Sequence, residues 1–464
     1  MTDIRDEKST ATPVGPSSRE LANRLSWAAF GRAAFMFGGF AVTTALVRSV
    51  TPETFGRYTL LLTTVTLASI FGIAGQGENL VRLVPPMTSA GRTSDIANEL
   101  VAAARIRRRA TALVVLIFGL VHVLGVPSVP WADSMSERIT IGSVAILWVI
   151  AQSWQGHISD VFRSFNDMRM AGLLAGGLKN LLLVIPLVVI LLVGVEIDLV
   201  TVAGLVVASL VLANLYAVYV WRRTRPEIDI KSGQPSLVEG RFRSGLPFAV
   251  NQLISIVFVR GSLYIIEAYG SSDEVAIYGA VVQLIILLTA PMLLIGTVLS
   301  PIISDLANDS ETTPQLQRIV AGVTGLAGLA STGVAIVIFV FATPLLTLLY
   351  GDFYAAGATS LVILAAGQLW NVWTGSCAHL LGMTGSQNTV AWINAIFAGV
   401  SLSLAALLVP SLGVSGAALA ASIAIVAQNT TLLVVAKRRT GVSSLGSPRL
   451  ALATVVSRGE ALKP

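Results

Sequence analysis

Charged residues are scarce in this sequence: Asp, Glu, Lys and Arg make up only 12% of the 464 residues. Soluble globular domains usually carry about twice that share, so the composition argues against an ordinary soluble protein. The single cysteine, Cys377, excludes an internal disulfide and is expected to be a small core residue. The sequence also shows no metal-ligand cluster, P-loop or nucleophile elbow. We therefore expect no metal or cofactor and no ATP hydrolysis, and predict that the protein is not an enzyme.

Apolar residues are abundant: they account for 54% of the chain, whose mean hydropathy is +0.77. Crossing a bilayer takes about 20 apolar residues. Twelve runs of this kind lie at 25–47, 58–84, 110–129, 138–160, 172–195, 199–221, 246–269, 276–303, 319–347, 359–381, 389–410 and 415–436. They lack the polar face of soluble-core helices and the alternation of β-barrel strands. The predicted fold is an all-α polytopic membrane protein with twelve transmembrane helices.

The basic residues are distributed unevenly between the two sides of the predicted spans. If the N-terminus is inside, most of the 31 Lys and Arg residues fall in inner segments. The positive-inside rule then places both termini in the cytoplasm. Anchoring to an anionic inner leaflet explains the excess positive charge, and no nucleic-acid partner is expected. Residues 1–24 and 437–464 are predicted to be cytoplasmic tails; the first, and the part after Arg439, are expected to be disordered.

The chain also contains an internal repeat. "TPETFGRY" at 51–58 is similar to "SSDEVAIY" at 271–278, and each segment opens the second span of a six-span half. Because both halves begin on the same side, the repeat is parallel, with a pseudo-twofold axis along the membrane normal. The longest basic loop, 222–245, is the predicted linker between the halves. We therefore predict an N-lobe at 25–221 and a C-lobe at 246–436.

Polar residues inside the spans are candidate binding residues, because such groups usually face a bundle interior or water. The seventh span carries Gln252, Arg260, Tyr264 and Glu267 on one helical stripe. Arg260 lies near mid-depth, whereas Arg32, in the first span, lies closer to the inner surface. Lobes of this kind usually enclose a cavity. Arg32 and Arg260 are therefore predicted to bind an anionic group at two levels of that cavity.

Two carboxylates in the spans have alternative interpretations. Glu78 either lines the cavity or forms an ion pair, with Arg82 four residues later or with Arg32 at a similar depth. Glu267 lies close to the outer surface, where it either lines the cavity or is solvated.

Spans four, five and ten contain further candidates. His157 and Asp160 either relay a proton or form a polar helix end. Lys179 is expected to extend its ammonium group to the inner surface from the end of the fifth span. The other candidate cavity-lining residues, which have packing as their alternative role, are Gln152, Gln155, Gln368, Asn371, Trp370 and Trp373.

Three stretches resemble the bacterial polysaccharide flippases. They are "LVRSVTPETFGRYTLLLTTVTLASIFGIAGQGENLVRLV", "VLSPIISDLANDSETTPQLQRIV" and "LLYGDFYAAGATSLVILAAGQLW". The similarity covers roughly 25 to 436. These flippases belong to the multidrug/oligosaccharidyl-lipid/polysaccharide exporter superfamily, whose members have twelve to fourteen spans in two lobes. Twelve predicted spans differ from the fourteen of the lipid II branch, so a peptidoglycan precursor is not the expected substrate.

The resemblance implies movement of a polyprenyl-diphosphate-linked oligosaccharide from the inner to the outer leaflet of the bacterial plasma membrane. Cationic cavity residues would handle the diphosphate, and Arg32 and Arg260 are the candidates. The expected partners are the lipid-linked glycan, membrane lipids and glycosyltransferases or polymerases, and the chain is expected to be a monomer. A proton, Na⁺ or the membrane potential would supply the energy. The alternatives are a drug/cation antiporter of the same superfamily, which would need an acidic cavity, and a polysaccharide polymerase or ligase, which would need a large outer loop.

Overall fold

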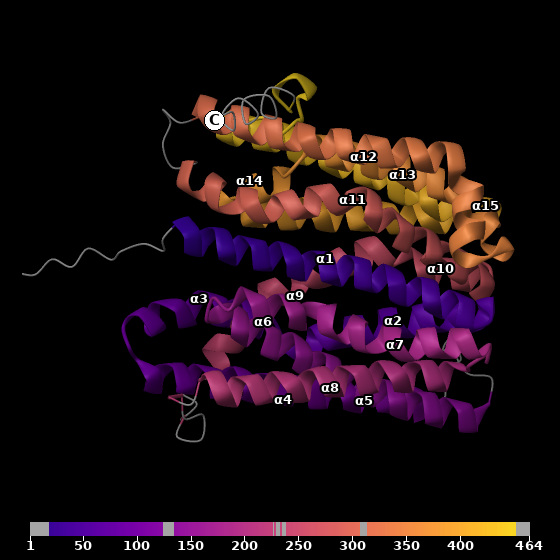
Figure 1. Cartoon of the computed structure of the whole chain (residues 1–464), viewed down its shortest axis with the longest axis horizontal. Coiled ribbons are helices and arrows are strands. Elements are labelled where there is room, and N and C mark those ends of the chain that lie inside the picture. The colour runs from indigo at the N-terminus through magenta and orange to yellow at the C-terminus, as the bar shows by residue number, and fades with distance from the viewer. Residues whose placement is uncertain are drawn as a thin grey trace, which may run out of the picture.

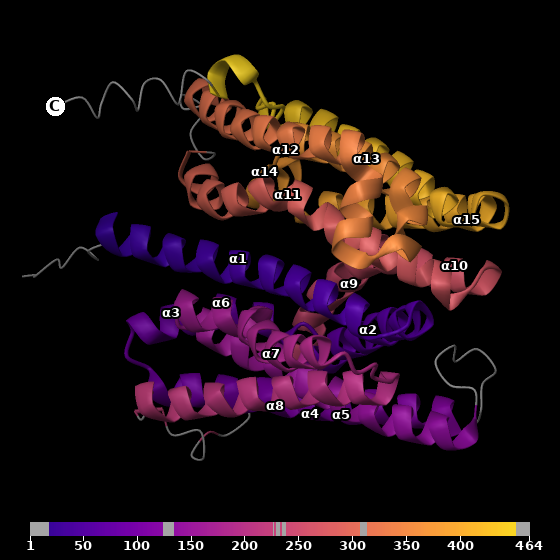
Figure 2. The ribbon, with the colours of Figure 1, turned by 45° about the vertical axis from the view of Figure 1, so that its right-hand side comes forward.

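The computed structural model describes residues 18–123, 134–225, 227–228, 233, 238–306 and 313–451. Almost all of these residues are helical, and none of them lies in a strand. This confirms the all-α prediction. The helices form two bundles that lie side by side (Figures 1 and 2).

The first bundle, which we call the N-lobe, contains the helices from α1 to α8 (Figure 1). They are α1 (Ser18–Ser49), α2 (Pro52–Ile73), α3 (Gln76–Ser89), α4 (Thr93–Val123), α5 (Met135–Ser164), α6 (Met168–Gly172), the π-helical turn η1 (Leu173–Gly177), α7 (Leu178–Val193) and α8 (Leu199–Thr224). The side chains of Thr51, Ser134 and Asp198 cap α2, α5 and α8 by accepting a backbone N–H three residues later.

The second bundle, the C-lobe, contains the helices from α9 to α15. They are α9 (Val238–Arg260), α10 (Ser262–Tyr269), α11 (Ser272–Leu306), α12 (Thr313–Tyr350), the 3₁₀ turn η3 (Asp352–Gly357), α13 (Ala358–Thr374), α14 (Cys377–Met383) and α15 (Gln387–Thr440). The stretch between α8 and α9 is therefore shorter than the predicted linker at 222–245.

Ten helical stretches of the described residues are long and apolar enough to span a membrane. One of them, α15, has 54 residues, which in a straight helix would extend about 80 Å. It reverses at Gly413 (φ 55°, ψ −135°), just after Pro410, and Gly416 packs back against the carbonyl of Leu408. The two legs of α15 coincide with the predicted spans at 389–410 and 415–436. With these legs counted separately, the described residues contain eleven apolar passes; α4 is not among the apolar stretches, so the count of twelve stays a prediction.

The beginning of α1 and the end of α15 lie at the same end of the molecule (Figures 1 and 2). We call it the basic end, because the arginine-rich parts of α4, α8 and α15 are there. The opposite end, the far end, carries the short turns between α1 and α2 and between α10 and α11. That the basic end faces the cytoplasm stays a prediction.

The chain after α15 is ordered as far as residue 451, contrary to the predicted disorder. The side chain of Gln317 on α12 donates to the Ser443 carbonyl (2.9 Å) and accepts the Ser443 N–H (2.5 Å). Ser444 is fully buried and donates to the Thr374 carbonyl (2.7 Å). Small residues allow this close packing, since a Cβ on Gly446 would lie 3.0 Å from the Gly325 nitrogen. Residues 18–24, predicted as tail, belong to α1; residues 1–17 and 452–464 lie outside the described residues.

Replacing Gln317 with leucine is expected to lower the thermal stability of the purified protein. The substitution leaves the Ser443 N–H and carbonyl without their partner, which should cost about 1–3 kcal/mol. The measurement is thermal unfolding in detergent, with limited proteolysis after residue 440 as a local readout. Gln315→Leu is the matched control, because Gln315 is exposed on the same helix. Equal melting temperatures for the two variants would contradict the packed arrangement.

Candidate anion-binding cavity between the lobes

The two lobes touch closely at the far end. Gly56 of α2 lies against Ser272 of α11, where a Cβ on Gly56 would be 1.8 Å from the Ser272 carbonyl oxygen. The Phe55 and Tyr354 rings meet edge to face, with centroids 6.3 Å apart. Arg48 of α1 donates from Nε to the Leu349 carbonyl of α12 (2.8 Å). These contacts close the space between the lobes at this end.

The lobes also meet towards the basic end, where α2 ends. Gly75 has a left-handed conformation (φ 66°), and a Cβ there would lie 2.0 Å from the Gly245 carbonyl oxygen of α9. Asn79 of α3 donates to the Ser244 hydroxyl (3.0 Å). The glycine at position 75 is required by both the backbone conformation and the close approach. The α2–α9 side of the interface is therefore in contact near both ends of α2.

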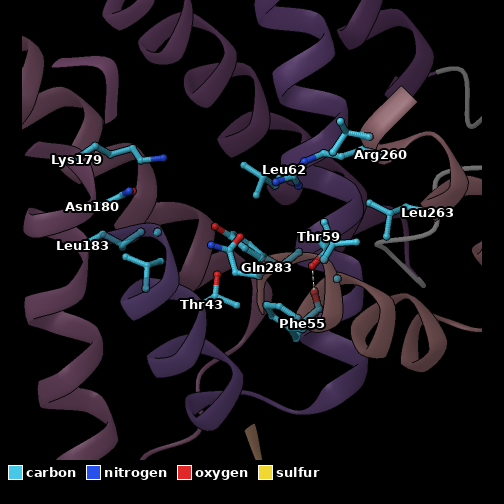
Figure 3. Close-up of a pocket in the computed structure, with 16 residues that line it drawn as sticks. Thr43, Phe55, Thr59, Leu62, Lys179, Asn180, Leu183, Arg260, Leu263 and Gln283 are labelled. Carbon is cyan, nitrogen blue, oxygen red and sulfur yellow. Dashed lines mark hydrogen bonds between the residues drawn. The ribbon is translucent and has the colours of Figure 1, made fainter. Parts of the chain in front are cut away.

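A cavity of about 90 Å³ lies between these contacts (Figure 3). The N-lobe contributes α1, α2 and α7 to its wall, and the C-lobe contributes α9, α10 and α11. Its polar lining residues are Thr43, Thr59, Lys179, Asn180, Arg260 and Gln283, together with Tyr58.

Two cations face each other in this cavity. Lys179 of α7 and Arg260 of α9 point towards one another from opposite sides (Figure 3). None of the described residues that line the cavity is Asp or Glu, and no carboxylate of the described chain lies within salt-bridge distance of either cation. Because like charges repel in a partly desolvated space, the arrangement favours binding of an anion.

Glycine-rich breaks in two helices position these cations. Lys179 follows the π-helical turn η1, in which Gly176 has φ 133°. A Cβ on Gly31 of α1 would be 2.5 Å from the Gly172 Cα, so the start of the α6–α7 span packs tightly on α1. Arg260 is the last residue of α9, immediately before the break at Gly261. Both side chains thus emerge where the helix changes direction.

Arg260 is the predicted site residue that lines this cavity; Arg32 does not. Arg32 is exposed on α1. The arrangement of two cations at two levels stays a prediction. In that arrangement Arg32 lies nearer the basic end than Arg260.

The other residues of the span-seven stripe lie outside the cavity wall. Gln252 is exposed. The hydroxyls of Tyr264 and Thr64 are hydrogen-bonded across the interface between the lobes. Glu267 is half-buried near the far end and accepts a hydrogen bond from the Ser272 hydroxyl (3.0 Å). Of the four residues on the predicted stripe, Arg260 alone lines the cavity. The interruption at Gly261 lies between Arg260 and Tyr264.

Glu78 forms an ion pair with Arg163 of α5 (2.8 Å). The partners that the sequence suggested, Arg82 and Arg32, do not pair with it in the described structure. The same guanidinium also pairs with Asp160 (2.9 Å). Asp160 therefore contacts Arg163, and no hydrogen bond joins it to His157 in the described structure. His157 is buried, with no hydrogen-bond partner for Nδ1 among the described residues. The proton-relay role of His157 and Asp160 stays untested.

The remaining polar candidates make contacts within one lobe. In the N-lobe, Gln152 accepts from Trp148 (2.9 Å) and donates to Thr66 (3.3 Å), and Gln155 is buried. In the C-lobe the bonds are Asn371 to Gln368 (2.8 Å), Trp370 to Thr430 (3.0 Å) and Trp373 to Thr332 (3.1 Å). These residues lie outside the wall of the central cavity, and the buried Nε2 of Gln155 has no hydrogen-bond partner among the described residues. Their cavity-lining role stays a prediction.

Sequence reasoning missed Lys179, Asn180 and Gln283 as cavity residues. The sequence predicts that Lys179 reaches the inner surface, because the predicted fifth span begins at residue 172. The helical stretch starts at Met168, which places Lys179 about 16 Å along it. The adjacent "AGGLKN" sequence was the available signal, since paired glycines permit the close α1 contact that turns the lysine inwards.

Two helical lobes around a central polar cavity give this chain the same architecture as solved drug exporters and a solved lipid flippase. An inward-facing multidrug resistance transporter of the MATE family, in the MOP superfamily, superposes with a TM-score of 0.73 at 15% identity, covering 89% of this chain and 98% of that one. An outward-facing structure of a MATE-family transporter gives 0.58 at 16% identity, with 91% and 96% coverage. The lipid II flippase MurJ, in an inward closed conformation, gives 0.67 at 14% identity, with 93% and 90% coverage.

The chain belongs to the polysaccharide biosynthesis protein family, whose sequence profile matches residues 28–307. The resemblance seen in the sequence motifs is thereby confirmed. No curated protein matches the chain. At 14–16% identity the solved structures establish the fold alone.

Proposed function

We propose that this protein is a flippase that moves a polyprenyl-diphosphate-linked oligosaccharide from the inner to the outer leaflet of the plasma membrane. The observation that carries the proposal is the pair of facing cations, Lys179 and Arg260, in a cavity without a described carboxylate. The basic end would face the cytoplasm, in keeping with the positive-inside rule. Membership of the polysaccharide biosynthesis family supports a saccharide-bearing substrate.

The cavity chemistry suits a diphosphate. Moving a diphosphate through hydrocarbon without compensation meets a large desolvation penalty. The guanidinium of Arg260 can bind two phosphate oxygens at once, and the ammonium of Lys179 adds a point charge from the opposite wall. Asn180 and Gln283 supply amide donors beside them. Together these groups would replace part of the hydration that the diphosphate loses.

The size of the cavity implies a change of conformation during transport. A cavity needs about 10–15 Å³ for each water molecule, so about 90 Å³ has room for a small anionic group but not for an oligosaccharide. The lobes must therefore separate for the glycan, first at the basic end and then at the far end. Rocking of one lobe against the other would provide this alternating access, driven by a proton, Na⁺ or the membrane potential.

The same cavity disfavours the drug/cation antiporter alternative. An organic cation would meet Lys179 and Arg260 without a described carboxylate partner in the wall, and repulsion at short range in a low dielectric is strong. The likeness to MATE structures concerns the fold alone. It does not alter the positive charge of this cavity, which opposes binding of a cation.

Removing either cavity cation is expected to reduce flipping. Arg260→Ala and Lys179→Ala should each slow transfer of a labelled polyprenyl-diphosphate oligosaccharide in proteoliposomes by roughly 10–100-fold, because one charge-assisted contact is worth about 1.5–3 kcal/mol. Arg260→Lys should retain part of the activity, since it keeps the charge but loses the planar fork. Arg318→Ala is the control, because Arg318 is an exposed arginine at the basic end. Wild-type transfer by a stably inserted Arg260→Ala protein would refute the site.

A further inference from the structure

A second space lies between the lobes, close to the cationic cavity. Its volume is about 250 Å³. Its wall contains Thr63 and Leu67 of α2, Val257 and Gly261 of the α9–α10 span, Tyr264 of α10 and Leu402 of α15. No charged residue lines it, and most of the lining side chains are half-buried. We call this space the apolar crevice.

The apolar crevice lies beside Gly261, where the seventh membrane span is interrupted between the end of α9 and the start of α10. A Cβ at this position would lie 2.5 Å from the Val257 carbonyl oxygen and 2.7 Å from the Leu402 Cδ2. The Val257 oxygen belongs to the backbone of the same span, so a larger residue at position 261 would have to shift that backbone, whereas the Leu402 contact from α15 is with the movable end of a side chain. The side chains of α2, α9, α10 and α15 around this position leave room for an apolar group.

Adjacent residues of the same helices face the two spaces. Arg260 lines the cationic cavity and Gly261 lines the apolar crevice. In α10, Leu263 lines the cationic cavity and Tyr264 lines the apolar crevice. Successive residues of a helix point about 100° apart, so the two spaces lie on neighbouring faces of α10 and α2. The hydrogen bond between the Thr64 and Tyr264 hydroxyls joins the lobes at this position.

We propose that the apolar crevice binds the isoprenoid chain of the lipid-linked substrate at the units next to the diphosphate. The inference rests on the proposed function, because it needs the diphosphate in the cationic cavity. In a prenyl diphosphate the hydrocarbon begins directly at the phosphate ester, so a cationic site and an apolar site must be neighbours. In a phospholipid a polar glycerol ester separates phosphate from hydrocarbon, which suits adjacent sites less well.

The volume and chemistry of the crevice fit this occupant. An apolar cavity of about 150 Å³ in another protein stays dry and binds benzene, so the crevice has room for a branched hydrocarbon unit. Each buried CH₂ group contributes about 0.8 kcal/mol, and a few buried carbons would therefore raise the affinity tenfold or more. The Thr64–Tyr264 hydrogen bond would open to admit the chain between the two spaces.

The test compares farnesyl diphosphate with inorganic diphosphate on the purified protein in nanodiscs of one lipid. We expect the wild type to bind farnesyl diphosphate at least tenfold more tightly. Leu402→Phe, which fills the crevice, should abolish this preference and leave inorganic diphosphate binding unchanged. Leu407→Phe is the matched control, because Leu407 is 73% exposed on the same helix. If Leu402→Phe does not fold, Ile256→Phe replaces it, since Ile256 also lines the crevice.

The outcomes separate the two proposals. Equal binding of both ligands by the wild type would overturn the crevice assignment and leave the flippase proposal standing. Binding of neither ligand would overturn the flippase proposal and the crevice assignment with it. A diazirine on the first isoprene unit should crosslink to α2, α9, α10 or the first leg of α15. Exclusive crosslinks elsewhere, or equal competition by phosphatidylglycerol, would also overturn the assignment.

Discussion

Replacing Gly56 with leucine is expected to stop transport almost completely while leaving the protein inserted. Even the first carbon of a side chain at this position would lie 1.8 Å from the Ser272 carbonyl oxygen and 2.7 Å from its carbon. These are backbone atoms at the start of α11, so no rotamer change can remove the clash. The lobes would have to separate at the far end, and alternating access requires that this end close once in each cycle.

The size of the expected effect follows from the conformational equilibrium. Each 1.4 kcal/mol against the closed far end changes the population ratio about tenfold, and overpacking a tight contact costs about 1–3 kcal/mol or more. We therefore expect transport to fall at least about fivefold for Gly56→Ala and further for Gly56→Leu. Gly279→Ala should have a smaller effect, because its neighbours are side-chain atoms of Thr59 at 3.1 Å or more.

Accessibility of the cavity would show whether this mechanism operates. In a Thr43→Cys background, a membrane-impermeant thiol reagent applied at the far end should label the Gly56→Leu protein faster than its Gly56 parent, which exposes the cavity there during only part of each cycle. The native cysteine, Cys377, is 1% exposed and should stay silent. Gly204→Leu is the control, because no atom lies within 4 Å of a Cβ at that position. Normal transport by Gly56→Leu would refute the closed far-end contact.

The helices could be predicted from the sequence because hydropathy reports the surroundings of each span directly. The hairpin in α15 was predictable for a local reason, since Pro410 and Gly413 interrupt a long apolar run. Arg260 was recognisable because an arginine near mid-depth must find water, an anion or a partner. Each of these features depends on residues close together in the chain.

Features that depend on contacts between distant residues were not predictable in this way. Arg163 is 85 residues from Glu78, so counting helical turns could only suggest nearer partners. The order of residues 441–451 depends on Gln317, 126 residues earlier, and Ser- and Gly-rich composition alone suggested disorder. Which polar stripe faces the cavity depends on helix bends, and the break at Gly261 separated Arg260 from Tyr264.

Repulsion between Lys179 and Arg260 destabilises the empty cavity, and a bound anion would offset this repulsion. Two like charges that face each other in a partly desolvated space repel, and the repulsion grows as the effective dielectric constant falls. Lys179 and Arg260 thus oppose each other in the empty cavity, and an anion between them would convert repulsion into two attractions. Stability without substrate and affinity for substrate should therefore change in opposite directions when one charge is altered.

Replacing Lys179 with glutamate should abolish flipping and raise the melting temperature of the substrate-free protein. The new carboxylate would pair with Arg260 across the cavity, which replaces like-charge repulsion by attraction and adds roughly 1–3 kcal/mol to the free energy of unfolding. The same pair would occupy the diphosphate site, so inorganic diphosphate should no longer shift the melting curve, whereas it should do so in the wild type. Thermal unfolding with and without diphosphate, beside the proteoliposome assay, measures both effects.

Lys179→Gln is the matched control, since it removes the charge and keeps a polar chain of similar shape. It should fall between the wild type and Lys179→Glu in substrate-free stability and retain weak diphosphate binding through Arg260. The combined variant Lys179→Glu/Arg260→Glu should be the least stable, because two carboxylates would then face each other. A Lys179→Glu protein that is less stable than the wild type, or that still flips substrate, would show that Lys179 and Arg260 do not share one anion site.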